Sequence, residues 1–108
     1  MPIVYLVQSC VFDTTPATAY GTIKQVLEGK EHLRKDIWKL LGDRLASFTD
    51  EDYILPVGDP AAIGAVCAEA AHQNHGRYKV LRWDRFKWNY KVVQVDMAWN
   101  CTKCAFEE

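Results

Sequence analysis

Two short turns carry the side chains best suited to ligand chemistry. They are Asp13-Thr14-Thr15-Pro16 and Gly58-Asp59-Pro60, and each follows an apolar run. If those runs are neighbouring parallel strands, both turns lie at the carboxyl edge of one sheet, where open α/β sheets bind ligands. Helix N-termini there suit phosphate, and Asp13 with Asp59 would offer oxygen ligands to Mg²⁺. The same residues are also ordinary helix caps, and no GxGxxG or Walker motif accompanies them.

A second candidate site is the basic, aromatic segment 76–93, which reads GRYKVLRWDRFKWNYKVV. Six basic residues against Asp84 give it a net charge of +5, so the other 90 residues carry −6. Cations neutralise phosphates and aromatic rings stack on unpaired bases, whereas Trp, Tyr and Arg also dominate protein–protein hot spots. We predict a contact surface for nucleic acid or a host protein, formed by Arg82, Trp83, Arg85, Phe86, Lys87, Trp88 and Lys91. A hairpin with a purely structural role is the alternative, because every second side chain of a strand faces the core.

A third candidate joins two histidines with two cysteines. Cys101 and Cys104 are spaced like half of a zinc knuckle. His72 and His75 lie near the predicted end of a helix, and an antiparallel hairpin would bring the C-terminal segment back toward them. Zinc is the one cofactor that these residues suggest. The helix phase argues against it, because at about 100° per residue His72 points away from the sheet. Two thiols in a tail are the alternative.

Length and composition fit a soluble domain. The chain has 108 residues, is 49% hydrophobic and carries a net charge of −1, so no global charge draws it to nucleic acid or membrane. No apolar run approaches the ~20 residues that span a bilayer, and the N-terminus lacks the basic start of a signal peptide. We therefore expect a cytoplasmic protein without membrane contact. No GxSxG or HExxH motif indicates an enzyme, and no catalytic residue is predicted.

The elements that must position these side chains alternate between strand and helix. Hydrophobic periodicity and capping residues define them. They are a strand over 3–12, a helix from Pro16 that stops at Gly29, a helix over 31–47, a strand over 53–57, a helix from Pro60 that ends at Gly76, and strands over 77–83 and 88–95. Ala19, Ile23 and Val26 form the apolar face of the first helix.

This β-α-α-β-α-β-β order predicts an α/β fold. We expect a single domain over 1–96, with helices packed on a mixed four-stranded sheet, and a C-terminal tail over 97–108. The turn DRFK joins the last two strands, because Asp is favoured at the first position of a type I turn.

The segments LPVGDPAAIG and VLRWDRFKWNY, within residues 52–96, resemble small proteins of tailed bacteriophages and prophages. The segment YLVQSCVFDTTPATAYG resembles the start of such proteins. The resemblance implies a small protein made during infection, in the host-cell cytoplasm, that binds host proteins or nucleic acid. It implies no activity and no catalytic residue.

Together these observations predict a binding protein that uses the basic aromatic hairpin. Two alternatives stay open. The first is an enzyme or small-ligand binder, for phosphate or Mg²⁺, at the strand-end edge formed by Asp13, Thr14, Thr15, Gly58 and Asp59. The second is a homo-oligomer whose interface buries the hairpin.

Overall fold

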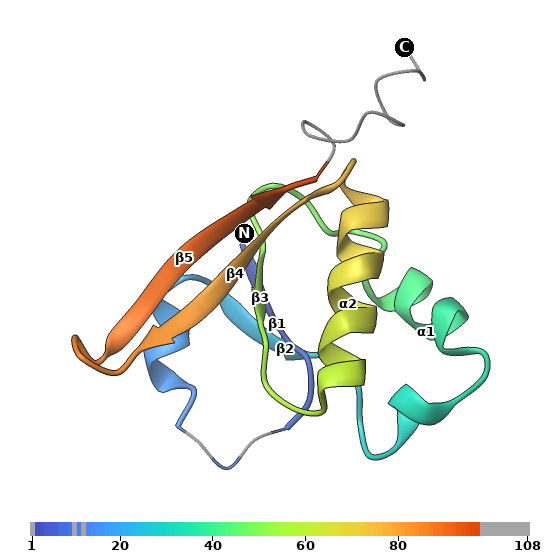
Figure 1. The fold of residues 1–108 in the computed structure, drawn as a ribbon, viewed down its shortest axis with the longest axis horizontal. Helices are drawn as coiled ribbons and strands as arrows, with labels where there is room; N and C mark the ends of the chain where they lie inside the picture. Colours follow the sequence, from blue (N-terminus) through green and yellow to red (C-terminus); the bar gives the residue numbers. More distant parts are fainter. Residues whose placement is uncertain (1, 10, 12, 98–108) are drawn as a thin grey trace.

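A mixed sheet lies at the centre of the structure, a computed structural model that describes residues 2–9, 11 and 13–97. Its strands are β1 (Ile3–Leu6), β2 (Thr22–Gln25), β3 (Tyr53–Leu55), β4 (Arg77–Asp84) and β5 (Asn89–Asp96). They follow the spatial order β2-β1-β3-β4-β5 (Figure 1). The first four are parallel, and β5 pairs antiparallel with β4. The predicted α/β class is confirmed, but the sheet has five strands rather than the predicted four.

The additional strand replaces most of the first predicted helix. Only a short 3-10 turn, η1 (Thr15–Ala19), is helical, and Thr22–Gln25 form β2 instead. Gly21 lies between η1 and β2 and has a φ of 157°. A Cβ atom at this position would collide with the backbone of Pro2. Parallel pairing with β1 then outweighs the helical spacing that the sequence suggested, since strand formation depends strongly on neighbouring strands.

The second predicted helix is also shorter than expected. It consists of a 3-10 turn, η2 (Glu31–Leu33), and the α-helix α1 (Ile37–Arg44). Arg34 breaks the helical path with an extended backbone, at φ −71° and ψ 144°. Its guanidinium pairs with the Asp36 carboxylate at 2.7 and 2.9 Å. Leu33, at the end of η2, is exposed.

The third helix, α2 (Pro60–Gln73), forms as the sequence predicts. Asp59 is its N-cap, and its carboxylate accepts a hydrogen bond from the Ala61 backbone N–H at 2.8 Å. The small residues Ala62, Val66 and Ala70 are buried against the sheet, so the helix axis can lie close to the strands. Neither α1 nor α2 is long and apolar enough to cross a membrane, and the same holds for the other described residues.

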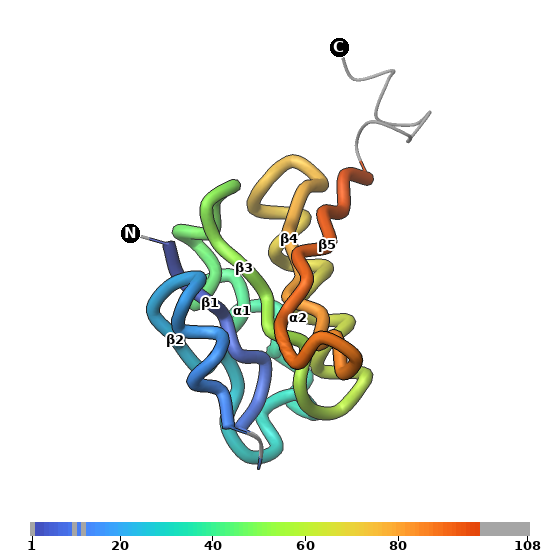
Figure 2. Tube along the Cα trace, turned by 90° about the vertical axis from the view of Figure 1, so that its left-hand side faces the viewer, coloured from blue at the N-terminus to red at the C-terminus, as the bar shows by residue number. Residues whose placement is uncertain are grey.

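The two faces of the sheet bury different clusters. On one face α1 and α2 cover Tyr5, Val7 and Ile54 (Figure 1). On the other face the strand residues pack with Ala17 of η1 and with the hairpin, and no α-helix of the described residues covers them. This cluster contains Val4, Leu6, Leu55 and Leu81. The hairpin continues past the short strand β3, so that its far end lies near η1 (Figures 1 and 2). The uncovered face therefore has room for a binding site.

Candidate binding groove beneath the hairpin

The register of the β4–β5 hairpin sorts the predicted contact residues onto two faces. The two strands pair over eight residues each without a bulge. Because successive strand residues point to opposite faces, Trp83 and its partner Tyr90 share the uncovered face with Leu81. Arg82 and its partner Lys91 point to the opposite face. Near the tip, this aromatic pair therefore lies on the other face from this basic pair, whereas Lys79, further along β4, shares the face of Trp83.

A groove of about 760 Å³ lies on the uncovered face, beneath the hairpin. The Trp83 ring packs edge-on against the rings of Tyr90 and Trp88, with centroids 5.0 and 6.2 Å apart. These three rings form the hairpin side of the groove. Most of the lining is apolar, and the lining residues are Asp13, Thr14, Pro16, Leu55, Pro56, Val57, Leu81, Arg82, Trp83, Trp88 and Tyr90. The groove thus joins the hairpin to the turn that follows β1.

The tip of the hairpin is held in shape by Asp84. Its carboxylate accepts hydrogen bonds from the backbone N–H groups of Phe86 and Lys87, at 3.0 and 3.3 Å. Phe86 and Trp88 then stand almost free in solvent, 87% and 76% exposed, and Trp83 is 40% exposed. Trp88 has a φ of 53°, in the left-handed region that bulky side chains rarely adopt. An ordered turn therefore presents two large rings outward.

Four cations surround this aromatic tip. Arg82 and Lys91 are exposed and lie directly opposite each other, an arrangement of like charges that destabilises a strand pair. Arg85 and Lys87 are exposed in the turn. Among the described residues, no salt bridge includes any of these four side chains. Their charge is available to acidic groups of a partner.

The Asp13 turn contributes to the groove but does not begin an α-helix. The hydroxyl and the backbone N–H of Thr15 donate to the Asp13 carboxylate, which lowers the pKa of that group. Thr14 is the residue before η1, and its side chain caps no N–H group. Because η1 is a five-residue 3-10 turn, it lacks the aligned dipoles of the helix N-terminus that the sequence predicted here.

The Asp59 turn lies in a different environment. The side-chain oxygen of Gln8 accepts a hydrogen bond from the Asp59 backbone N–H at 2.7 Å. The side-chain nitrogen of Gln8 lies 3.1 Å from Nδ1 of His32. Nδ1 must then accept, and the His32 proton sits on Nε2, which is 3.9 Å from the Asp59 carboxylate. Gly58 has a φ of 127° beside the Gln8 side chain. Asp59 thus belongs to a hydrogen-bonded cap.

The two turns with Asp13 and Asp59 follow strands that pair with each other. β1 and β3 are parallel neighbours, so the turns after them lie at the same edge of the sheet. The groove takes in Asp13 and Thr14 but neither Gly58 nor Asp59. Of the five residues proposed for phosphate or Mg²⁺, this groove therefore includes Asp13 and Thr14.

The predicted zinc ligands fall in two places. His72 is exposed on α2, beside a depression between α1 and α2, and His75 follows the helix with a φ of 57°. Cys101 and Cys104 lie outside the described residues. Within the described part of the chain, no three His, Cys, Asp or Glu side chains gather as a metal site requires.

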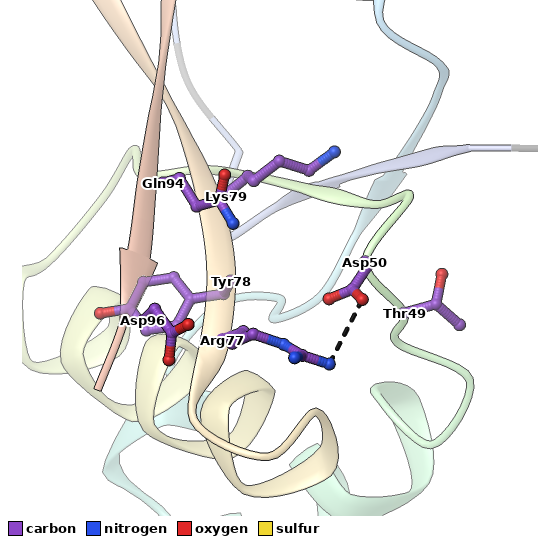
Figure 3. A pocket seen from close by; sticks show the side chains of 7 residues that line it. All are labelled: Thr49, Asp50, Arg77, Tyr78, Lys79, Gln94 and Asp96. Carbon is purple, nitrogen blue, oxygen red and sulfur yellow. Dashed lines mark hydrogen bonds and ion pairs between the residues drawn. The ribbon is translucent and has the colours of Figure 1, made fainter. Parts of the chain in front are cut away.

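A second, polar cavity of about 340 Å³ lies at the opposite end of the hairpin (Figure 3). Arg77 and Lys79 extend from β4 toward the loop that carries Asp50, while Tyr78 points the other way (Figure 3). Arg77 reaches the Asp50 carboxylate at 3.3 Å, and the Lys79 ammonium lies 4.2 Å from the centre of the Tyr53 ring. These two cations, unlike those at the tip, are already engaged within the chain.

The exposed rim of the groove contains aromatic residues of the predicted contact surface, whereas its interior comes from residues that the sequence did not single out. Trp83 and Trp88 were predicted because they are aromatic residues in a basic segment. Leu55 and Val57 were read only as strand residues, and they line the groove because β3 lies next to β4. The hairpin register pairs Trp83 with Tyr90, and this pairing would have indicated that Tyr90 belongs to the groove.

Comparison with known proteins identifies a phage protein family. The model of the family described as Phage Pam3 gp32-like protein matches residues 2–97, which is nearly the whole described part of the chain. Neither the curated proteins nor the solved structures contain a match. The phage context suggested by the resemblance is thus supported, and the chain belongs to the Phage Pam3 gp32-like protein family.

Proposed function

We propose that this phage protein is a binding protein that docks a segment of a partner protein, expected to be a host protein, in the groove beneath the hairpin. The observation that carries the proposal is the groove itself. It is large enough for several side chains, it is lined mainly by apolar residues, and Trp83 and Trp88 form its exposed rim. Exposed tryptophans beside an apolar depression are typical of interaction hot spots.

The backbone of Trp88 supports this proposal. Position 88 has a left-handed φ, which glycine or asparagine adopts with less strain than tryptophan. A turn selected for stability alone would favour one of those residues. A tryptophan that is 76% exposed gains little from burial in return. We infer that the indole is retained for a contact with a partner.

The distribution of charge favours a protein partner over nucleic acid. A single strand is bound where cations and stacking rings share one surface. On the paired strands, Arg82 and Lys91 point away from the face that holds Trp83 and Tyr90. A ligand in the groove therefore meets mainly apolar surface, and Arg82 is the one cation among the described residues that line it. This arrangement suits an apolar peptide segment with flanking acidic residues.

Nucleic acid is the second candidate, and the tip is the feature that favours it. Arg85, Phe86, Lys87 and Trp88 alternate cation and ring, and all four side chains are exposed. A single strand that crosses the tip, without entering the groove, would meet both kinds of group.

Selection of displayed random peptides on the immobilised chain tests the first proposal. We expect enriched peptides with apolar anchors and acidic flanks. Their affinity should fall at least tenfold for Trp88→Gly, because a central hot-spot tryptophan contributes about 2 kcal/mol or more. The matched control is Trp38→Ala, since Trp38 is another exposed tryptophan, on α1, and is remote from the groove. Equal binding by the wild type and Trp88→Gly would contradict the proposal.

The nucleic-acid candidate is tested with single-stranded oligonucleotides over a salt series. Binding through the tip predicts that affinity falls steeply with salt and that the double variant Arg85→Ala/Lys87→Ala binds more weakly with a smaller salt slope. If the wild type and this variant bind alike, the nucleic-acid candidate fails while the groove proposal stands.

A further inference from the structure

The outer edge of β5 is long, and no backbone hydrogen bond from another described element reaches its middle. Of the two edge strands, β2 has four residues and β5 has eight. Natural edge strands are kept from pairing by proline, bulges, shortness or charge. β5 contains no proline, its register with β4 has no bulge, and its middle residues Val92, Val93 and Gln94 are uncharged. This edge has few of the usual protections.

The hydrogen-bond pattern identifies the groups that face outward. The Met97 N–H donates to the Gly76 carbonyl oxygen at 2.9 Å. Because backbone direction alternates along an antiparallel strand, the N–H and C=O groups of Val93 also point toward β4, whereas those of Val92 and Gln94 point away from it. Among the described residues, no hydrogen bond outside the hairpin uses the backbone of Val92 or Gln94.

The tip end of β5 is occupied. Tyr20, which follows η1, donates its hydroxyl hydrogen to the Tyr90 carbonyl oxygen at 3.1 Å. The free part of the edge is therefore confined to the middle of the strand. Val92 and Val93 in that region expose 39% and 37% of their surface, on opposite faces of the sheet. An added strand would cover both.

We propose that the middle of β5 pairs antiparallel with the same strand of a second copy of this chain. The charge pattern of the strand supports this occupant, because its two charged residues are Lys91, in its first half, and Asp96, at its end, and the residues between them are neutral. An antiparallel copy places the positive end of each strand beside the negative end of the other, so the strand complements itself. A two-fold symmetric contact of this kind is the commonest form of self-association.

One register uses the outward backbone groups of both Val92 and Gln94. A two-fold axis at Val93 sets Val92 of each copy opposite Gln94 of the other, and each such pair exchanges both N–H···O bonds. Val93 packs on its own counterpart, and Lys91 lies across from Val95 beside Asp96. The shared surface does not include the groove, so this contact is independent of the proposed partner docking.

Sedimentation of the full chain over a concentration series tests the proposal. The wild type is expected to pass from monomer to dimer as concentration rises. Val92→Pro should remain monomeric over the same range, because it removes an outward N–H that the hairpin does not use and proline is tolerated on an exposed strand edge. The matched control Val92→Thr keeps that N–H and should dimerise like the wild type.

Further measurements separate this contact from other modes of association. Trp88→Gly should dimerise normally, since Trp88 lies in the groove; loss of the dimer in this variant would overturn the edge contact in favour of a groove contact. Hydrogen exchange requires no variant. The amides of Val92 and Gln94 should be protected only at concentrations where the dimer forms. A wild type that stays monomeric, or a dimer in which these amides exchange freely, contradicts the proposal.

Discussion

At the scale of the residue, Gly58 shows how a turn depends on the absence of a side chain. Its φ is 127°, and a Cβ atom there would collide with the side chain of Gln8. Gln8 in turn accepts from Asp59 and contacts His32. We expect Gly58→Ala to lower the free energy of unfolding by at least about 1–3 kcal/mol, because backbone strain of that size adds to the displacement of Gln8. Urea denaturation measures the change.

Gly64 is the matched control for that prediction. It lies inside α2, and a Cβ atom there meets nothing within 4 Å. Gly64→Ala should therefore raise the free energy of unfolding by about 0.4–1 kcal/mol, since alanine lowers the entropy of the unfolded chain and favours helix. If the two substitutions change stability in the same direction, the assigned roles of the two glycines are wrong.

At the scale of the element, one ion pair joins η2 and the end of β2 to α1. The two terminal nitrogens of the Arg44 guanidinium donate to the Glu31 carboxylate, at 2.7 and 3.1 Å. One of them also donates to the Val26 carbonyl oxygen at 2.7 Å. The Arg44 guanidinium, together with the Glu28 N–H, lowers the pKa of Glu31 to about 2, from an ordinary value of 4.5. The pair thus fixes a strand end and two helical segments.

This pKa gives stability a defined pH dependence. Because the folded-state pKa lies below the unfolded one, the contribution of Glu31 is fully present above pH 4.5 and is lost as pH falls toward about 2. The thermal midpoint of the wild type should therefore fall toward that of Glu31→Gln across this window. Thermal unfolding followed by circular dichroism at several pH values measures both. A constant difference between the two proteins down to pH 2 would rule out this role for Glu31.

The prediction of the elements from sequence succeeded where a signal was long or capped. α2 has a capping aspartate, an initial proline and a long run of small residues, and the structure confirms it. The strand β2 was not predicted, because four residues are too few to show an alternating pattern and the spacing of Ile23 and Val26 fits a helix. Its strand conformation comes from pairing with β1. That strand lies too far away along the sequence for a local pattern to reveal the pairing.

At the scale of the whole molecule, stability should differ between the centre of the sheet and the hairpin tip. β1 lies between two strands, and Val4, Tyr5 and Val7 are almost fully buried. In the described part of the chain no strand lies beyond β5, and the tip half of the hairpin exposes most of its side chains. Amide hydrogen exchange should therefore be slowest in β1 and β3 and much faster around the turn. Equal protection of the tip and β1 would mean that the hairpin is more firmly held than its burial indicates.

The candidate site was predictable only in part, for a reason that belongs to the whole molecule. Charge and aromatic content identified Trp83 and Trp88 without any knowledge of the fold. The apolar interior of the groove requires β3 beside β4 and the Asp13 turn across from both, which is a product of strand order. Strand order depends on contacts between distant segments, and sequence periodicity does not encode them.

The cluster of Trp83, Trp88 and Tyr90 also makes the protein its own optical probe. Rings held 5.0 and 6.2 Å apart at fixed angles couple their electronic transitions, so the near-ultraviolet circular dichroism of the folded chain should carry a band that Trp88→Gly removes. Trp88 emits from a largely aqueous environment, and filling the groove would shift that emission to shorter wavelength. Occupancy of the groove can thus be followed without attaching a label.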